Sequence, residues 1–156
     1  MYRVIVTLIL AAACMTGIAR AEECTETVYA GLVKEAKSAD ANHLWDSSVE
    51  LSRRILDECR HLIPEGDLVK LYDSLSVGLL MQEKYGEAVD MAKRCFEQDN
   101  RYNSCMMTAA KAYESLGDRA MAIQFAREAI ETGGSDDYST AVVIYAKDFL
   151  KKLERK

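Results

Sequence analysis

The sequence predicts an all-α fold: a right-handed α-solenoid of about three helical hairpins, followed by a C-terminal capping helix. The 156 residues include eight glycines and one proline, whereas β-sandwiches and barrels need a turn about every 8–12 residues. Apolar residues recur at the spacing of amphipathic helices. Residues 69–102 also align with residues 103–136, so that Ala88 falls on Ala122, 34 residues later. A period of this length indicates a repeat protein.

Residues 1–21 have the three parts of a secretory signal peptide. Arg3 precedes an unbroken apolar run, Val4–Ala13, and an A-x-A cleavage site follows at Ala19–Ala21. The run is too short to cross a bilayer as a helix, so we expect no membrane span. The pattern predicts cleavage after Ala21 and export, with a periplasmic location in a bacterial cell envelope. Residues 22–156 would then form the repeat domain.

A second form of export is left open by the same segment. Ala11–Cys14 resembles a bacterial lipobox, in which Cys14 would carry a lipid anchor. Cleavage after Ala21 would instead remove Arg3, Arg20 and Cys14. Because no acid leaves with them, the formal net charge would go from −5 to −7. An acidic chain without a basic stripe binds nucleic acid poorly, so no nucleic-acid partner is expected.

A degenerate first repeat, residues 26–64, is expected to open the array. Its second helix is His43–Pro64, in which Ser48 lies 40 residues before Ala88. About six residues are therefore inserted relative to the later repeats, and we expect them to form extra turns that end before Pro64. The apolar positions of its first helix, expected to face inward, are Val28, Leu32, Ala36 and Ala39.

The two later repeats, residues 69–102 and 103–136, each read as two helices. In the last repeat Gly117 ends the first helix and Gly133 ends the second. Small side chains at Ala110 and Ala122 would let these two helices approach closely, and Tyr113 would fill the space beside them. A capping helix over residues 136–153 follows, with inward positions at Val142, Val143, Tyr145, Ala146, Phe149 and Leu150.

The repeated segments KYGEAVDMAKRCFEQD (84–99) and LGDRAMAIQFAREAIE (116–131) resemble the second-helix pattern of the tetratricopeptide family. The chain departs from that pattern with Ala110 at a frequent glycine, Met106 at a frequent tryptophan and Glu83 at the turn glycine. The resemblance implies stacked helical hairpins whose first helices line a concave side. The positions that carry the packing pattern are Ala88, Ala92, Cys95, Ala110, Tyr113, Gly117, Ala122, Ala126 and Ala129.

Four cysteines remain after cleavage of the signal peptide, and an even number in an exported chain indicates disulfides. Three pairings are available in principle. In the hairpin arrangement Cys24 begins the first helix and Cys59 ends the second, while Cys95 ends one hairpin and Cys105 begins the next. We therefore predict the pairs Cys24–Cys59 and Cys95–Cys105, with buried free thiols as the alternative.

No pattern in the sequence indicates catalysis. There is no nucleophile elbow, phosphate loop or H-E-x-x-H, and the cysteines lack the C-x-x-C spacing of redox and zinc sites. His43 and His61 have no cysteine, acid or histidine at ligand spacing. We expect a protein that is not an enzyme and that needs no cofactor or metal.

The remaining candidate site is the concave surface implied by the repeat arrangement. Apolar and lysine side chains alternate there, which suits a partner segment with apolar anchors and some acidic residues. We expect a non-catalytic adaptor or assembly factor that binds another protein or peptide. The alternatives are a self-associating structural subunit and a thiol-based redox helper. The candidate surface residues are Val33, Lys34, Lys37, Lys70, Asp73, Val77, Leu80, Met107, Thr108 and Lys111.

Overall fold

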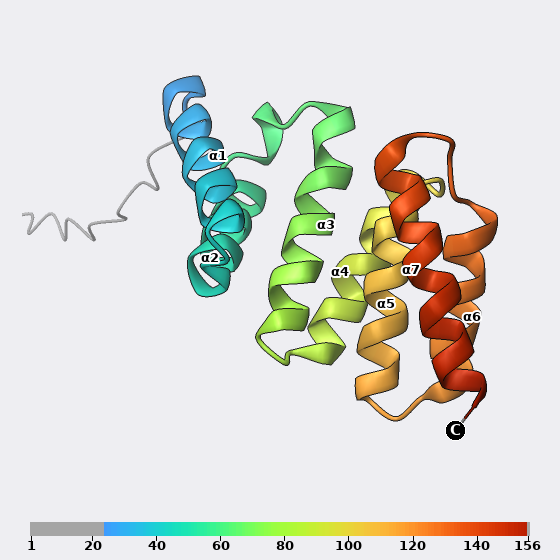
Figure 1. Ribbon diagram of the computed structural model, residues 1–156. Helices are drawn as coiled ribbons and strands as arrows, with labels where there is room; N and C mark the ends of the chain where they lie inside the picture. Colours follow the sequence, from blue (N-terminus) through green and yellow to red (C-terminus); the bar gives the residue numbers. More distant parts are fainter. Residues whose placement is uncertain (1–23, 156) are drawn as a thin grey trace, which may run out of the picture.

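The computed structural model describes residues 24–155, which form seven α-helices and one 3-10 turn (Figure 1). The segment with the predicted signal peptide and Cys14 lies outside the described residues. The elements are α1 (Glu26–Ala41), α2 (Trp45–Glu58), η1 (Arg60–Leu62), α3 (Glu65–Met81), α4 (Tyr85–Gln98), α5 (Asn103–Ser115), α6 (Arg119–Glu131) and α7 (Asp137–Glu154).

The helices form three antiparallel hairpins, α1–α2, α3–α4 and α5–α6, which stand side by side in chain order (Figure 1). The last helix, α7, packs against α5 and α6 and closes the array. The predicted all-α solenoid is therefore confirmed. The inserted residues of the first repeat form η1, which links α2 to α3, and α3 begins at Glu65 rather than at residue 69.

The three hairpins turn in the same way. The residue after each first helix has a positive φ: 57° at His43, 61° at Glu83 and 81° at Gly117. At each turn the next amide donates to a carbonyl five residues back, as in Leu44 to Ala39 and Asp118 to Tyr113, both at 2.9 Å. This is the Schellman arrangement, which glycine adopts most easily. The sequence supplies that glycine only in the last hairpin.

Small side chains allow the helices of each hairpin to lie close together. Ala88, Ala110 and Ala122 are fully buried, and Tyr113 stacks on Phe125 with 5.5 Å between ring centroids. Two expected inward positions are wrong. Val28 is 43% exposed and Tyr145 is 46% exposed. Tyr145 lies off the buried face of α7, which Ala146, Phe149 and Leu153 supply, and Val28 lies off the buried stripe of α1.

Neighbouring hairpins contact each other through residues spaced by one repeat. Arg53 forms an ion pair with Glu87, and the Tyr138 hydroxyl donates to Ser104 Oγ at 3.0 Å. In both pairs the partners are 34 residues apart. A repeat period in the sequence thus becomes a direct contact in the stack, as expected when each repeat touches only its neighbours.

Gly78 sets the distance between α2 and α3. A Cβ at this position would lie 2.7 Å from Val49 Cγ2, and both residues are buried. We expect Gly78→Ala to lower the free energy of unfolding by about 1–3 kcal/mol, because the first hairpin must shift away from α3. Urea denaturation measures this effect. Gly66→Ala is the matched control, since a Cβ there meets no atom within 4 Å; an equal loss in both variants would contradict this role for Gly78.

Within residues 24–155, no helix combines the length and the apolar character that a bilayer span requires.

Candidate functional site

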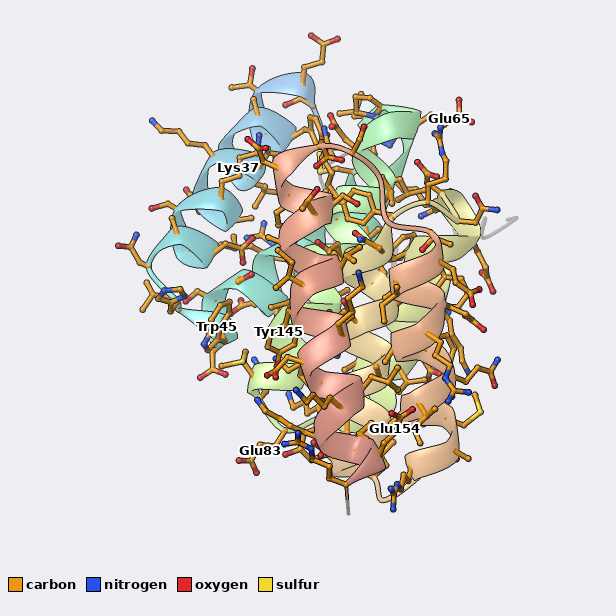
Figure 2. The ribbon with its side chains drawn as sticks, turned by 45° about the vertical axis from the view of Figure 1, so that its right-hand side comes forward. Lys37, Trp45, Glu65, Glu83, Tyr145 and Glu154 are labelled. Carbon is orange, nitrogen blue, oxygen red and sulfur yellow. A yellow bond between two sulfur atoms is a disulfide. The ribbon has the colours of Figure 1, made fainter. Side chains whose placement is uncertain are left out.

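The first helices α1, α3 and α5, together with α7, carry the predicted concave residues. Lys34, Lys37 and Lys70 are exposed, as Figure 2 illustrates for Lys37. A second group is partly exposed: Val33, Asp73, Val77 and Lys111. Leu80, Met107 and Thr108 are instead buried. Leu80 packs in the cluster around Val49 and Leu79, and Met107 belongs to the core shared with α7, so these three side chains contribute mainly to packing.

A cleft of about 200 Å³ lies between α1 and α3, and α2 forms its floor. The apolar part of the lining consists of aromatic and aliphatic side chains, and Lys37, Asp67 and Lys70 stand among the polar ones. Lys70 Nζ lies 2.9 Å from Asp67 Oδ1 on the same helix. The lining residues are Tyr29, Val33, Ala36, Lys37, Asp40, Ser52, Ile55, Asp67, Lys70, Leu71 and Ser74.

The cleft exists because α1 packs extensively only against α2. The link through η1 sets the first hairpin at a greater spacing from α3 than a regular repeat would have. Asp40 near the end of α1 bridges the gap, since its carboxylate accepts hydrogen bonds from Ser48 of α2 and Ser74 of α3. Asp40 therefore fixes one end of the cleft and leaves the rest of the wall uncovered.

Ser52 on the cleft floor has a buried hydroxyl without a hydrogen-bond partner. The equivalent positions in the other two hairpins are Ala92 and Ala126, which are also fully buried. An unpaired buried hydroxyl costs about 1–3 kcal/mol. A polar atom at the bottom of an apolar cleft is therefore available to bind the backbone of a segment lying in that cleft.

A second hollow, of about 300 Å³, continues the concave side between α5 and α7. Met107 and Thr108 form part of its lining, and α7 contributes Val142 and Tyr145. Lys111 Nζ lies 5.6 Å above the centre of the Tyr145 ring, a cation–π distance. The sequence placed Tyr145 in the core, whereas Figure 2 shows it among the exposed side chains of α7.

The largest hollow, about 590 Å³, lies outside the concave side, between α2 and α4. Its rim is charged, and the charges partly satisfy each other: Arg53 pairs with Glu87, and Arg60 donates to the Tyr72 hydroxyl at 3.1 Å. A ligand there would have to displace these contacts. The smaller α1–α3 cleft offers apolar walls and an unpaired hydroxyl, so it is the better candidate site.

Asp73 lies where α3 meets α5, next to the concave surface. Ser104 Oγ donates to Asp73 Oδ1 at 2.9 Å, and Tyr138 of α7 donates to Ser104 in turn. Burial, together with the negative charge of Asp40, raises the pKa of Asp73 to about 6, against the lowering effect of the Ser104 hydrogen bond. Burial and the nearby Asp73 likewise raise the pKa of Tyr102 to about 12.

Both predicted cysteine pairs are joined as disulfides. Cys24 bonds to Cys59, 35 residues later, and connects the start of α1 to the end of α2. Cys95 bonds to Cys105, 10 residues later, and connects the second hairpin to the third. The sulfurs belong to buried residues in both cases.

No family model and no curated protein matches this chain. Among solved structures, the chain is similar to PcrH in complex with the chaperone binding region of PopD, with a TM-score of 0.71 at 16% identity over 85% of this chain and 95% of that one. It is also similar to PcrH from Pseudomonas aeruginosa, with a TM-score of 0.69 at 15% identity over 84% and 95% of the two chains. At this identity the likeness concerns the fold, and it shows a tetratricopeptide-like array of helical repeats.

Proposed function

We propose that this protein is a non-catalytic module that binds a segment of another protein in the cleft between α1 and α3. It would act as an adaptor or assembly factor. The signal-like residues 1–21 add the proposal that it is exported and works in the periplasm of a bacterial cell, or on a lipid anchor at Cys14.

The observation that carries this proposal is the cleft itself. Its walls come from two helices that a regular array would place in contact, and its floor holds the unpaired hydroxyl of Ser52. An extended segment can offer a backbone carbonyl to that hydroxyl and apolar side chains to Val33 and Leu71. The solved complex of the similar protein PcrH holds a partner's chaperone binding region, which supports a protein segment as the ligand.

The charges around the cleft favour a segment that carries acidic residues beside its apolar anchors. Lys34 and Lys37 are exposed on α1, while Asp40 is engaged by two serines and Asp67 by Lys70. The positive groups are thus more accessible to a ligand than the negative ones. Such pairs at the rim of an interface mainly direct association and orientation.

The first experiment identifies the partner and the site together. The full chain with a C-terminal tag is expressed in its native host, mildly cross-linked and analysed by mass spectrometry, and peptides of the captured partner are then titrated by calorimetry. We expect Val33→Glu, in the cleft wall, to abolish binding. Ile144→Glu is the matched control, because Ile144 is an apolar residue that is 65% exposed on α7. Equal binding by both variants contradicts the site, and recovery of the chain alone favours self-association.

A substitution at Ser52 should change stability and binding in opposite directions. We expect Ser52→Ala to raise the free energy of unfolding by about 1 kcal/mol, because an unpaired buried hydroxyl is removed. The same change should weaken peptide binding by about three- to tenfold, the equivalent of one lost hydrogen bond. Urea denaturation and calorimetry measure the two effects.

Ser76→Ala is the control for this pair of effects. Ser76 is also fully buried, but its Oγ donates to the Asp73 carbonyl oxygen at 2.8 Å. Its loss should lower stability without changing affinity. Unchanged peptide affinity in Ser52→Ala would show that the hydroxyl does not contact the ligand.

A further inference from the structure

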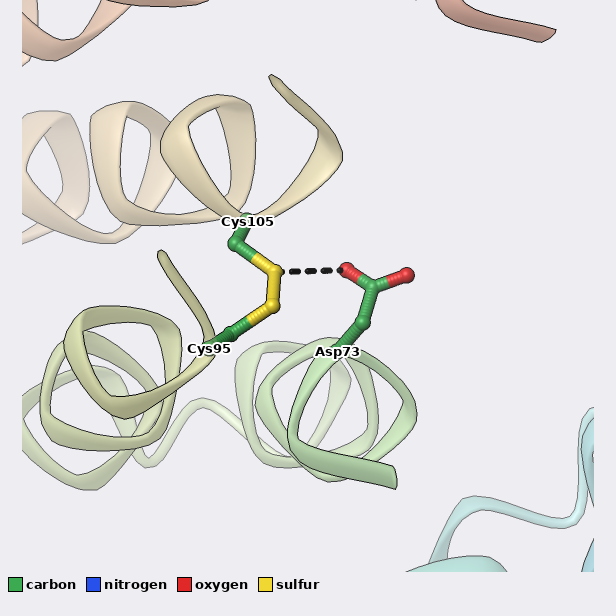
Figure 3. A group of neighbouring side chains, drawn as sticks. All are labelled: Asp73, Cys95 and Cys105. Carbon is green, nitrogen blue, oxygen red and sulfur yellow. Dashed lines mark hydrogen bonds between the residues drawn. A yellow bond between two sulfur atoms is a disulfide. The ribbon is translucent and has the colours of Figure 1, made fainter. Parts of the chain in front are cut away.

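Three metal-binding side chains converge where the second and third hairpins meet (Figure 3). Asp73 comes from the middle of α3, Cys95 from the last turn of α4 and Cys105 from the first turn of α5. One ligand atom from each lies within 4.8 Å of the other two. Cys105 Sγ and Asp73 Oδ1 are 3.5 Å apart.

The surroundings of the two sulfurs consist of oxygen acceptors. Cys95 Sγ lies 3.4 Å from the carbonyl oxygen of Val69, and Cys105 Sγ faces the Asp73 carboxyl group. A disulfide sulfur carries no hydrogen, so neither contact is a hydrogen bond while the cysteines are paired. The charged group that acts on Asp73 is another acid, Asp40. The cluster therefore combines buried acceptors with a carboxyl group that no neighbouring cation compensates.

We propose that reduction of the Cys95–Cys105 disulfide creates a site for a divalent cation of the zinc type, bound by the two thiolates and one Asp73 oxygen. Thiolate ligands select zinc-like ions over magnesium or calcium. With Zn–S of about 2.3 Å and Zn–O of about 2.0 Å, a tetrahedral site separates sulfur from oxygen by about 3.5 Å. The Cys105–Asp73 distance already has this value, so the sulfurs need only move apart.

The chemistry balances as follows. A dithiol or phosphine reductant supplies two electrons that break the S–S bond, and two protons complete the thiols of Cys95 and Cys105. Cation binding then releases both protons to solvent, because thiolates are the ligands. Water fills the fourth position, and Ser104 holds Asp73 in place through its hydrogen bond.

The full chain, reduced with a phosphine, is titrated with Co²⁺ and then with Zn²⁺. We expect one Co²⁺ per chain, with the thiolate charge-transfer band and the d–d bands of tetrahedral cobalt, both lost when Zn²⁺ displaces it. The oxidised chain should bind none. Asp73→Asn should weaken Zn²⁺ binding by about ten- to a hundredfold or more, since even residues that only orient a ligand have effects of this size.

Two cysteine variants separate this site from adventitious binding. Cys24→Ser/Cys59→Ser keeps the proposed ligands and should bind as the reduced wild type does. Cys95→Ser/Cys105→Ser should bind no cobalt, with circular dichroism checking that its helices persist. Binding retained in this second variant overturns the proposal. So does a reduced wild-type chain that neither binds Zn²⁺ nor regains helicity when the metal is added.

Discussion

A chain with serine at both Cys24 and Cys59 is expected to be about 3–4 kcal/mol less stable than the wild type. The disulfide closes a loop of 35 residues, and the chain-entropy model gives a value of this size for such a loop. The loss should be concentrated in α1, because this helix packs extensively only against α2. Hydrogen exchange should therefore show residues 26–41 losing protection first, while α3–α7 stay protected.

Cys95→Ser/Cys105→Ser is the comparison for this result. Its loop spans only 10 residues, so the same model gives about 2.5–3 kcal/mol, and the loss should not appear first in α1. Because α1 forms one wall of the proposed binding cleft, loss of Cys24–Cys59 should also abolish peptide binding. Amides of α1 that remain as protected as those of α3 would contradict this role for the disulfide.

The second large effect concerns Asp73 in the oxidised protein. Folding raises its pKa from 3.8 to about 6, so the folded state favours the protonated form. The stability that this group contributes is full below about pH 4 and is lost as the pH rises through about 6. An asparagine side chain cannot ionise, so Asp73→Asn should exceed the wild type by about 2–3 kcal/mol at pH 8, since each pKa unit corresponds to about 1.4 kcal/mol.

The measurement is the difference in urea stability between Asp73→Asn and the wild type at a series of pH values. This difference should grow between about pH 4 and pH 6 and then level off. Asp148→Asn gives the opposite sign, because Lys152 lowers the pKa of the exposed Asp148 carboxyl. That control should lose a little stability above pH 4. A pH-independent difference for Asp73→Asn would mean that Asp73 is not desolvated by folding.

The sequence predicted the hairpins well because their determinants are local. Positions such as Ala88 and Ala122 need small side chains for close helix packing, and the Gly117 turn and the Asp136 cap are recognisable from a few residues. The pairing of the cysteines followed from the antiparallel course of the helices.

The candidate site was less predictable because it depends on how whole hairpins are spaced. Leu80 and Met107 are apolar residues on first helices, and only the packed array decides that they are buried. The hydroxyl of Ser52 has no partner because α1 and α3 stand apart, and no local pattern encodes that separation. The Asp73 cluster likewise joins three helices, so its ligands have no recognisable sequence spacing.

The short link through η1 makes the spacing of the first hairpin a property of chain length. His43 and Glu83, at equivalent turns, are 40 residues apart, whereas Glu83 and Gly117 are 34 apart. Elsewhere in the array α3 contacts α5 and α5 contacts α7. An ancestor with equal repeats would thus have had α1 seated against α3 and no opening. Binding capacity in such a protein can arise by insertion in a connector, without any substitution in the walls of the cleft.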